Sequence, residues 1–373
     1  MTIAFYENTN EISEILSDAA ADLTNALRSS ALVNGPFVQQ LEADICSWTG
    51  SGHAIAVNSA TDGLIIALKA ANIGPGDEVI APCYSFFATA SSIAHVGAVP
   101  VFVDIDAATY ALDVDKVEAA ITSRTRAIMP VHLFCQMADM PRLMQLAQRY
   151  NLRVIEDSAE AIGMSQQTQH AGTIGDLGVF SFFPTKTLAA LGDAGMIVTQ
   201  DEKLAVRCRS IANLDHANLE NIGQSSFPSG LDDWQAVILR HRLRRLEKSV
   251  QQRGNHAAHL TKLLSTINQV QTPHYVDRGY GGSAVFYVYL IEAERRDELA
   301  SHLSAQGIGT EAYYPLPLHQ QPVFRHLGYS EGDFPVAEAA SKRALGLPMH
   351  AELTGKAVET IAREVASFYR GSL

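Results

Sequence analysis

The first two hundred residues alternate short apolar runs with segments of helical periodicity. The apolar runs stop at polar clusters, and they cover Ala54–Val57, Glu78–Ala81, Val99–Val103, Ala127–Val131 and Arg153–Ile155. Buried strands that alternate with helices of about 10–15 residues are typical of parallel βαβ units. The sequence therefore predicts an α/β sheet, with ligands bound where the carboxyl ends of its strands meet.

The chain is expected to contain two domains. Residues 1–245 are predicted to form a large α/β domain, whose N-terminal arm holds a helix over residues 11–28. From about residue 284 the pattern becomes that of an antiparallel strand, a helix and a proline-rich segment, so residues 246–373 are predicted to form a smaller α+β domain. An arginine-rich helix over residues 234–253 is interpreted as a solvated, salt-bridged helix face.

The charge and composition exclude several classes of function. The 373 residues carry a formal charge of −12, which argues against nucleic acid or an anionic membrane as a partner but permits a small phosphate ligand. No apolar run reaches the roughly 18 residues of a membrane-spanning helix. The N-terminus lacks the basic region of a signal peptide, so a cytoplasmic location is expected. The four cysteines are far apart and form no metal-ligand pattern, so no metal is expected.

Several familiar motifs are missing. The chain has no G-x-G-x-x-G after a strand, no phosphate-binding G-x-x-x-x-G-K-[ST] and no G-x-S-x-G. Asp104 and Asp106 form a D-x-D pair such as metal-dependent glycosyltransferases use, but two carboxylates often follow a strand by chance. We therefore do not interpret the pair as a metal site.

Three features together indicate another chemistry. Lys186 lies between the aromatic run Phe180–Pro184 and a glycine-rich turn, where burial would lower the pKa of its ammonium and free the amine as a nucleophile. Asp157 ends an apolar strand, where a carboxylate can hold a proton on a pyridine nitrogen. Asn58–Thr61 precedes a helix and offers hydroxyl and backbone donors to a phosphate. Pyridoxal phosphate requires these three parts.

The chain resembles the DegT/DnrJ/EryC1/StrS family of sugar aminotransferases, which belongs to the fold-type-I pyridoxal phosphate enzymes. The resemblance runs from about Gly35 to Leu353. The motifs that carry it are Asn-Ser-Ala-Thr at 58–61, Gly-Pro-Gly-Asp-Glu-Val-Ile-Ala-Pro at 74–82, Pro-Val-Phe-Val-Asp-Ile-Asp at 100–106, Ile-Glu-Asp-Ser-Ala-Glu-Ala at 155–161, Phe-Ser-Phe-Phe-Pro-Thr-Lys at 180–186 and Tyr-Pro-Leu-Pro-Leu-His at 314–319. It implies a large mixed-sheet α/β domain, a smaller C-terminal domain and a homodimer with shared active sites.

The resemblance also implies roles for individual residues. Lys186 would form the internal aldimine and then move the proton between the substrate carbon and the cofactor. Asp157 would pair with the pyridinium nitrogen, and Phe86 would cover the face of the ring. The phosphate would be bound by Ala60, Thr61 and Ser181. Tyr314 and His319 are predicted to contact the sugar.

Five positions depart from the family pattern or need a separate interpretation. Glu160 stands where many members have Gln facing the 3′ oxygen of the cofactor. Pro228 and Gly230 replace the Asn and Arg of a segment that reaches the neighbouring subunit's phosphate site, and Cys135 replaces a glycine. We interpret His132 as structural rather than catalytic.

The function implied is a two-step transamination through pyridoxamine phosphate. The donor would be L-glutamate and the acceptor a keto-sugar nucleotide, such as a 3- or 4-keto-6-deoxy sugar of polysaccharide or antibiotic biosynthesis. Related sugar dehydratases carry His in place of the lysine, so Lys186 argues against that activity. An aminotransferase for keto-cyclitols or other antibiotic precursors, and a catalytically silent homologue, remain alternatives.

Overall fold

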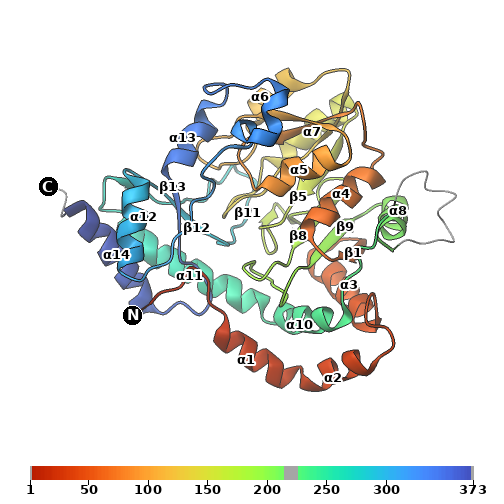
Figure 1. Ribbon diagram of the computed structural model, residues 1–373, viewed down its shortest axis with the longest axis horizontal. Helices are drawn as coiled ribbons and strands as arrows, with labels where there is room; N and C mark the ends of the chain where they lie inside the picture. The colour runs from red at the N-terminus through yellow and green to blue at the C-terminus, as the bar shows by residue number, and fades with distance from the viewer. Residues whose placement is uncertain (1, 214–225, 371–373) are drawn as a thin grey trace.

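A seven-stranded mixed sheet forms the centre of the chain in the computed structural model, which describes residues 2–213 and 226–370 (Figure 1). The strand order is β1-β9-β8-β5-β4-β2-β3. β9 pairs antiparallel with both its neighbours, and the other strand pairs are parallel. The strands are β1 (His53–Val57), β2 (Glu78–Pro82), β3 (Val99–Val103), β4 (Thr125–Ile128), β5 (Arg153–Asp157), β8 (Leu177–Ser181) and β9 (Gly195–Thr199).

Helices cover both faces of this sheet, which explains why β2, β8 and β9 are buried along their whole length. One hydrophobic cluster joins the sheet to α4, α5 and α8, and another joins it to α3 and α10. The helices are α1 (Thr9–Asp18), α2 (Ala20–Arg28), α3 (Pro36–Thr49), α4 (Ala60–Ala70), α5 (Phe87–His95), α6 (Val114–Ala120), α7 (Met140–Tyr150), α8 (Glu202–Asn213) and α10 (Asp233–Leu243).

The C-terminal part has its own antiparallel sheet, of strand order β10-β12-β13, and its own hydrophobic cluster. Its elements are α11 (Leu246–Leu264), β10 (Val270–Gln271), β12 (Tyr289–Ala293), α12 (Arg296–Ala305), α13 (Pro335–Arg343), β13 (Ala344–Leu347) and α14 (Gly355–Arg370), with 3-10 turns at Leu318–Gln320 and Pro322–Leu327. Ile3 forms a bridge to Ile308 and packs in the same cluster, so the start of the chain lies against this C-terminal sheet. The boundary at 245/246 stays a prediction.

A third, small sheet joins the two parts of the chain. Its strands are β6 (Ser165–Gln166), β7 (Gln169–His170) and β11 (Gly282–Ser283), in the order β11-β6-β7. It pairs a hairpin that follows β5 with the segment that precedes β12.

Both predicted long helices are interrupted in the structure. The N-terminal helix ends at Asp18 and a second helix begins at Ala20, and the two lie along α10 (Figure 1). The arginine-rich segment divides into α10 and α11, with Arg244 and Arg245 between them. Continuous apolar periodicity cannot reveal such a break, because both halves keep the same spacing.

The arginine-rich segment forms salt bridges, as expected, but it is not wholly solvated. Arg240 pairs with Asp44 on α3 at 2.7 Å, and Arg245 pairs with Glu14 on α1 at 3.0 Å. Arg242 is buried, and its guanidinium lies 3.0 Å from Glu11 and 2.6 Å from the carbonyl oxygen of Ala189. The expectation of a fully solvated face is therefore wrong for Arg242, which joins the N-terminal arm to the loop that carries Lys186.

The two carboxylates of the D-x-D pair accept hydrogen bonds from backbone N–H groups of nearby segments. Asp104 accepts hydrogen bonds from the N–H groups of Val336 and Ala337, in the first turn of α13. Asp106 accepts from the N–H groups of Ala108 and Thr109. Both carboxylates are thus occupied by backbone donors. Among residues 2–213 and 226–370, no helix combines the length and the apolar character needed to cross a membrane.

Candidate active site

Lys186 lies on the loop between β8 and β9, and its side chain is largely enclosed. Its N–H donates to the carbonyl oxygen of Phe183 at 2.8 Å, which forms a tight turn at the lysine. The side chain is 15% exposed, and Nζ lies 3.5 Å from Oε1 of Glu160. Nζ also lies 4.2 Å from the centre of the Tyr287 ring, over its face. The amine is thus held between a carboxylate and an aromatic ring.

The expected lowering of the Lys186 pKa is wrong for the enzyme without cofactor. Burial lowers the pKa of the ammonium, but Tyr287, Glu160 and Asp157 raise it by more, so the pKa lies above its ordinary value. The aromatic run and the glycine turn correctly predict burial. They do not reveal the acidic partner, which comes from another loop.

Asp157 ends β5 and is buried. Its Oδ2 accepts a hydrogen bond from Oγ1 of Thr89 at 2.7 Å, and Ser85 Oγ lies 2.8 Å from Oγ1 of Thr89. Because the one hydroxyl proton of Thr89 goes to the carboxylate, Ser85 is the donor in the second bond. Burial raises the pKa of Asp157, while the bond from Thr89 and the charge of Lys186 oppose that shift. A positively charged ring nitrogen placed here would complete the carboxylate's partners.

Glu160 connects three segments of the site. Its Oε2 accepts a hydrogen bond from the N–H of Phe134 at 3.0 Å. Its Oε1, the oxygen that faces Lys186, also lies 3.3 Å from the hydroxyl of Tyr314. Tyr314 is buried beside this carboxylate, and burial followed by the charge of Glu160 raises its pKa well above the ordinary value. The phenol therefore stays protonated and serves as a hydrogen-bond donor to Glu160.

The N-terminus of α4 lies beside the ends of β8 and β9. Ala60 and Thr61 are its first residues, and Ser59 caps it by accepting a hydrogen bond from the N–H of Asp62 at 3.1 Å. Ser181 pairs with Gly195 across the two strands, and a Cβ at Gly195 would lie 2.8 Å from the nitrogen of Ala60. Glycine is required for this close approach.

The phosphate donors expected from the sequence lie together here. Within the described ranges, the N–H groups of Ala60 and Thr61 have no hydrogen-bond acceptor, as the first donors of a helix usually lack one inside the helix. Free N–H groups at a helix N-terminus suit a phosphate. Lysine, carboxylate and N–H donors therefore fit pyridoxal phosphate, although the roles of Ala60, Thr61 and Ser181 stay predictions.

The segment of Pro228 and Gly230 packs on this same turn of its own chain. Ser229, between them, donates from Oγ to Oδ2 of Asp62 at 2.9 Å, and its carbonyl oxygen accepts from the N–H of Asn58 at 2.9 Å. Most of the residues that precede this segment, 214–225, lie outside the described residues. Ser229 thus lies against the first turn of α4, while Pro228 is exposed and Gly230 lies close to Val33 and Asn34.

The two other predicted residues, Phe86 and His319, have different surroundings. Phe86 precedes α5 and is 61% exposed, with its ring centre 6.4 Å from that of Tyr314. His319 is buried, and its Nε2 lies 3.1 Å from Glu338. Its ring packs against Phe334, with 4.7 Å between the ring centres. Covering of the cofactor by Phe86 and sugar contact by His319 both stay predictions.

His132 has the structural environment that the sequence interpretation requires. Its Nδ1 accepts a hydrogen bond from the N–H of Ala138 at 3.1 Å, so Nε2 carries the proton and donates to Glu156 at 2.9 Å. Glu156 also accepts from the N–H groups of Gly172, Ile174 and Gly175 at 2.6–2.8 Å. His132 therefore links the N–H of Ala138 to Glu156, and Glu156 fixes the turn that precedes β8.

Three site residues were not identified from the sequence. Thr89 has a weak signal, because Ser85 and Thr89 are four residues apart and place two hydroxyl groups on one side of a helix start. Tyr287 lies in an apolar run that reads only as a strand. Tyr84, whose hydroxyl accepts from the N–H of Tyr314 at 2.8 Å, lies next to a strand end with no distinguishing neighbour.

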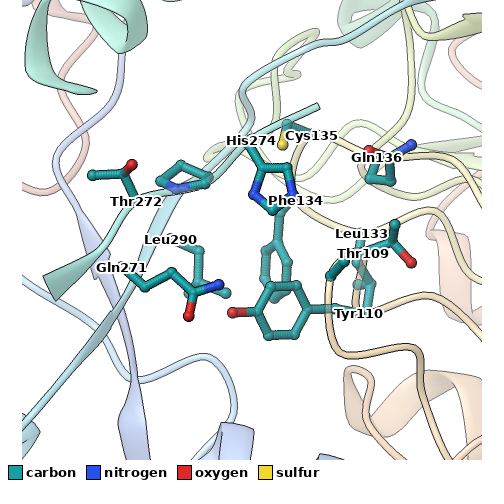
Figure 2. A pocket seen from close by; sticks show the side chains of 12 residues that line it. Thr109, Tyr110, Leu133, Phe134, Cys135, Gln136, Gln271, Thr272, His274 and Leu290 are labelled. Atoms are coloured by element: carbon teal, nitrogen blue, oxygen red, sulfur yellow. The ribbon is translucent and has the colours of Figure 1, made fainter. Parts of the chain in front are cut away.

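A pocket between the loops that follow β3 and β4 and the segment that follows β10 contains none of the predicted site residues. Figure 2 shows Gln271 and Thr272 on one side of it and Thr109 and Gln136 on the other, with His274 between them near Cys135. Phe134 contributes both to this pocket, which it lines, and to the candidate active site, where its N–H donates to Glu160. Cys135, which replaces a family glycine, is buried in the wall of this pocket rather than beside Lys186.

A lysine on a strand-end loop, a buried carboxylate at the end of a parallel strand and a helix N-terminus with free donors define a pyridoxal phosphate enzyme of fold type I. The comparisons with known proteins specify the family. A model of the DegT/DnrJ/EryC1/StrS aminotransferase family matches residues 13–366. The chain belongs to this family.

Full-length relatives agree with this assignment. The chain is 44% identical over 372 residues to the pleiotropic regulatory protein of Geobacillus stearothermophilus, covering 99% of each chain. It is 41% identical over 364 residues to the UDP-N-acetyl-3-dehydro-alpha-D-glucosamine 3-aminotransferase of Acidithiobacillus ferrooxidans, covering 96% of this chain and 93% of the relative.

Solved structures agree as well. DesV of S. venezuelae, determined in complex with a ketimine intermediate, has a TM-score of 0.93 at 34% identity and covers 98% of each chain. NtdA of Bacillus subtilis, with bound pyridoxamine phosphate, has a TM-score of 0.84 at 29% identity and covers 95% of this chain and 82% of that chain. The expected fold class, the pyridoxal phosphate cofactor and the aminotransferase activity are thereby confirmed.

Proposed function

We propose that this aminotransferase transfers the amino group of L-glutamate to a keto-sugar that is linked to a nucleotide. The relative from A. ferrooxidans, at 41% identity, is named for an amino transfer to carbon 3 of a UDP-linked N-acetyl sugar. This supports a keto-sugar nucleotide as acceptor and favours a ketone at C3 over one at C4. The observation that carries the proposal is the position of Lys186, whose amine lies between Glu160 and Tyr287.

Pyridoxal phosphate, when bound, supplies an aldehyde that takes up the amino group and a ring that withdraws electrons from the carbon that loses a proton. Lys186 is the only group of the predicted set that can both bind the aldehyde and move that proton. Asp157 would hold the ring nitrogen in its protonated form. Glu160 holds the amine of Lys186, and Tyr314 orients Glu160.

The remaining predicted residues bind the cofactor phosphate, cover the cofactor ring or contact the sugar. Ala60 and Thr61 donate backbone N–H groups to the phosphate, and Ser181 adds a hydroxyl. Phe86 covers the ring face. Tyr314 and His319 contribute to the sugar site from the proline-rich segment.

We propose that two chains form a homodimer with shared active sites. Three aromatic side chains that follow the ends of β2 and β8 are exposed in the single chain: Phe86 at 61%, Phe87 at 41% and Phe183 at 47%. A partner chain that covered them would remove this apolar surface from water. Light scattering at micromolar concentration tests this, and a monomer with full cofactor affinity would refute it. The four cysteines are free thiols, which supports a reducing compartment such as the cytoplasm.

The test of the reaction has two halves. L-glutamate is added to the enzyme loaded with pyridoxal phosphate, and conversion to pyridoxamine phosphate is followed by absorbance. The pyridoxamine form is then offered UDP-linked 3-keto-N-acetylglucosamine, dTDP-linked 3-keto- and 4-keto-6-deoxyglucose, and a keto-cyclitol. We expect the nucleotide 3-keto sugars to restore pyridoxal phosphate and Lys186→Ala to block both halves. Turnover with the keto-cyclitol alone would refute the proposed substrate class, and no conversion by glutamate would refute the donor.

A further inference from the structure

Tyr287 brings the C-terminal part of the chain against the catalytic lysine. It lies just before β12, and its side chain is enclosed, at 6% exposed. The face of its ring lies 4.2 Å from Nζ of Lys186. Its hydroxyl lies 3.1 Å from Oγ1 of Thr185, the neighbour of that lysine in the chain. Ring and hydroxyl thus both contact the loop that carries Lys186.

The backbone of Tyr287 is fixed on two sides. Its N–H donates to the carbonyl oxygen of Phe134 at 3.3 Å, and the N–H of Phe134 in turn binds Glu160. Its carbonyl oxygen accepts from Nη1 of Arg253 at 3.3 Å. Arg253 is buried, and the same Nη1 donates to the carbonyl oxygen of Met349 at 2.6 Å. These bonds leave the ring of Tyr287 little freedom to move away from the lysine.

We propose that Tyr287 is a positioning residue for Lys186: the face of its ring holds the protonated amine, within reach of Glu160, whenever that amine is not bonded to the cofactor. A cation over an aromatic face is attracted by the electron density of the ring, and the attraction is larger where water is excluded. The neutral amine gains much less from the ring. The proposal rests on Lys186 being the amine of the proposed transamination.

The contact has a measurable consequence for the charge of Lys186. The titratable and charged groups that face its amine are Glu160 and Asp157 on one side and Tyr287 on the other. Behind them lie Tyr314 beside Glu160, Tyr313 beside Tyr287 and Glu160, and Arg253 beside Tyr287. The hydroxyl of Tyr287 raises the pKa of Lys186 by its charge and by a hydrogen bond. The face of the ring adds an attraction of its own, which Tyr287→Leu removes and Tyr287→Phe keeps. If the pKa of the amine falls by about one unit, the fraction of neutral amine at any pH below the pKa increases roughly tenfold.

The experiment measures Lys186 directly in the full chain without cofactor. Trace acetic anhydride labels free amines, and mass spectrometry of the peptide that contains Lys186 gives the labelling rate from pH 7 to 11. If a substitution lets the reagent reach Lys186 more easily, the labelling rate increases by the same factor at every pH. A change in the pKa of Lys186 instead moves the midpoint of the curve of labelling rate against pH. The variants are Tyr287→Leu, which removes the ring, and Tyr287→Phe, which keeps the ring and removes the hydroxyl.

Tyr289 supplies a matched control, because it is equally buried on the same strand segment and its hydroxyl bonds to Thr261 at 2.7 Å rather than near Lys186. We expect the midpoint to fall by about one pH unit more in Tyr287→Leu than in Tyr287→Phe, and to remain within about 0.3 unit of the unchanged enzyme in Tyr289→Leu. If Tyr287→Leu does not fold, as judged by circular dichroism, Tyr287→Met takes its place.

Two outcomes would overturn the proposal. An unchanged midpoint in Tyr287→Leu would show that the ring does not hold the charge. An equal fall in Tyr287→Phe would assign the effect to the hydroxyl. The labelling needs no sugar and no amino donor, so a failed substrate panel leaves this measurement unaffected, and the two proposals fail separately.

Discussion

Oγ1 of Thr89 donates a hydrogen bond to Oδ2 of Asp157 at 2.7 Å, inside the protein and out of contact with solvent. The donor comes from the first turn of α5 and the acceptor from the end of β5, so the bond joins a helix to a strand of the large sheet. It favours the ionised carboxylate, the form that pairs with a protonated ring nitrogen.

Replacing Thr89 by Val is therefore expected to weaken cofactor binding. Valine keeps the shape of threonine but leaves Asp157 without its side-chain donor, which raises the pKa of that carboxyl further. The loss of one hydrogen bond to a buried charge corresponds to roughly tenfold weaker binding of pyridoxal phosphate. Fluorescence titration of the cofactor-free protein measures it. Thr89→Ser, which keeps the hydroxyl, should bind within about threefold of the unchanged enzyme, and equal losses in both variants would contradict the role of the bond.

The raised pKa of Asp157 predicts how stability depends on pH. In the unfolded chain the carboxyl ionises at its ordinary value near 3.9, while in the folded protein without cofactor burial keeps it protonated to higher pH. Between these two values the folded state binds more protons, so stability falls as pH rises. Asp157→Asn removes this loss. In urea unfolding, the stability of Asp157→Asn relative to the unchanged protein should increase from pH 4 to pH 8, and a constant difference would refute the assignment.

His170 should produce the opposite pH dependence. Burial lowers its pKa from the ordinary 6.5 to about 4, and its neighbour His132 adds to the shift, while the bond to Ala171 and the charge of Glu156 oppose it. Its Nε2 accepts from the N–H of Gly163 at 2.8 Å, which requires the neutral ring. Between pH 6.5 and 4 the unfolded state binds the extra proton, so stability decreases by about 3 kcal/mol as pH falls.

His170→Phe keeps an aromatic ring between Trp48 and Phe180, the two rings that His170 contacts. It should lower the stability at pH 7, because the N–H of Gly163 loses its acceptor. It should also flatten the pH dependence between pH 7 and pH 4.5. Guanidinium unfolding at a series of pH values provides the comparison, and an unchanged slope in the variant would show that His170 is not the group that titrates.

The sequence predicts the frame of this enzyme well because the frame depends on local periodicity. The strands that lead to Asp157 and Ser181, and the helix that begins at Ala60, follow from apolar runs that end at polar clusters. The carboxyl ends of such strands must lie along one edge of the sheet. The lysine, the carboxylate and the helix N-terminus can therefore be placed near one another without a structure.

The contacts that tune the site cannot be predicted in this way, because each joins residues far apart in the chain. Tyr287 reaches Lys186 from the segment before β12, and Glu160 meets Tyr314 across more than 150 residues. No periodicity links such positions. The burial of Lys186 was correctly predicted, but the direction of its pKa shift depends on these distant partners and was not.

Glu160→Gln removes the negative charge next to the lysine. A neighbouring carboxylate favours the protonated form of a cation, so its removal should lower the pKa of the amine or of the protonated nitrogen that Lys186 forms with the cofactor, by roughly one to three units. The pH titration of the visible absorbance band of the loaded enzyme gives this midpoint. Gln keeps the acceptor for the N–H of Phe134, so the fold should be retained. Identical titrations of the two proteins would exclude an electrostatic role for Glu160.

Gly195→Ala tests whether the close approach of β9 to α4 forms the phosphate site. The added Cβ would lie 2.8 Å from the nitrogen of Ala60 and 2.8 Å from the carbonyl carbon of Ser59, and both are backbone atoms that cannot rotate away. The first turn of α4 must shift, so its free N–H groups lose their alignment. We expect binding of pyridoxal phosphate to weaken on the order of 100-fold, and binding of pyridoxal without phosphate to change much less, because the helix terminus serves only the anion.

Gly254, inside α11, provides the matched control for that substitution. A Cβ there meets open space, so Gly254→Ala should leave cofactor affinity unchanged and stabilise the helix by up to about 1 kcal/mol. If Gly195→Ala weakened the binding of pyridoxal phosphate and of pyridoxal equally, the substitution would not act through the phosphate site. Because overpacking against backbone costs about 1–3 kcal/mol, thermal unfolding of both variants shows whether the affinity change exceeds a general loss of stability.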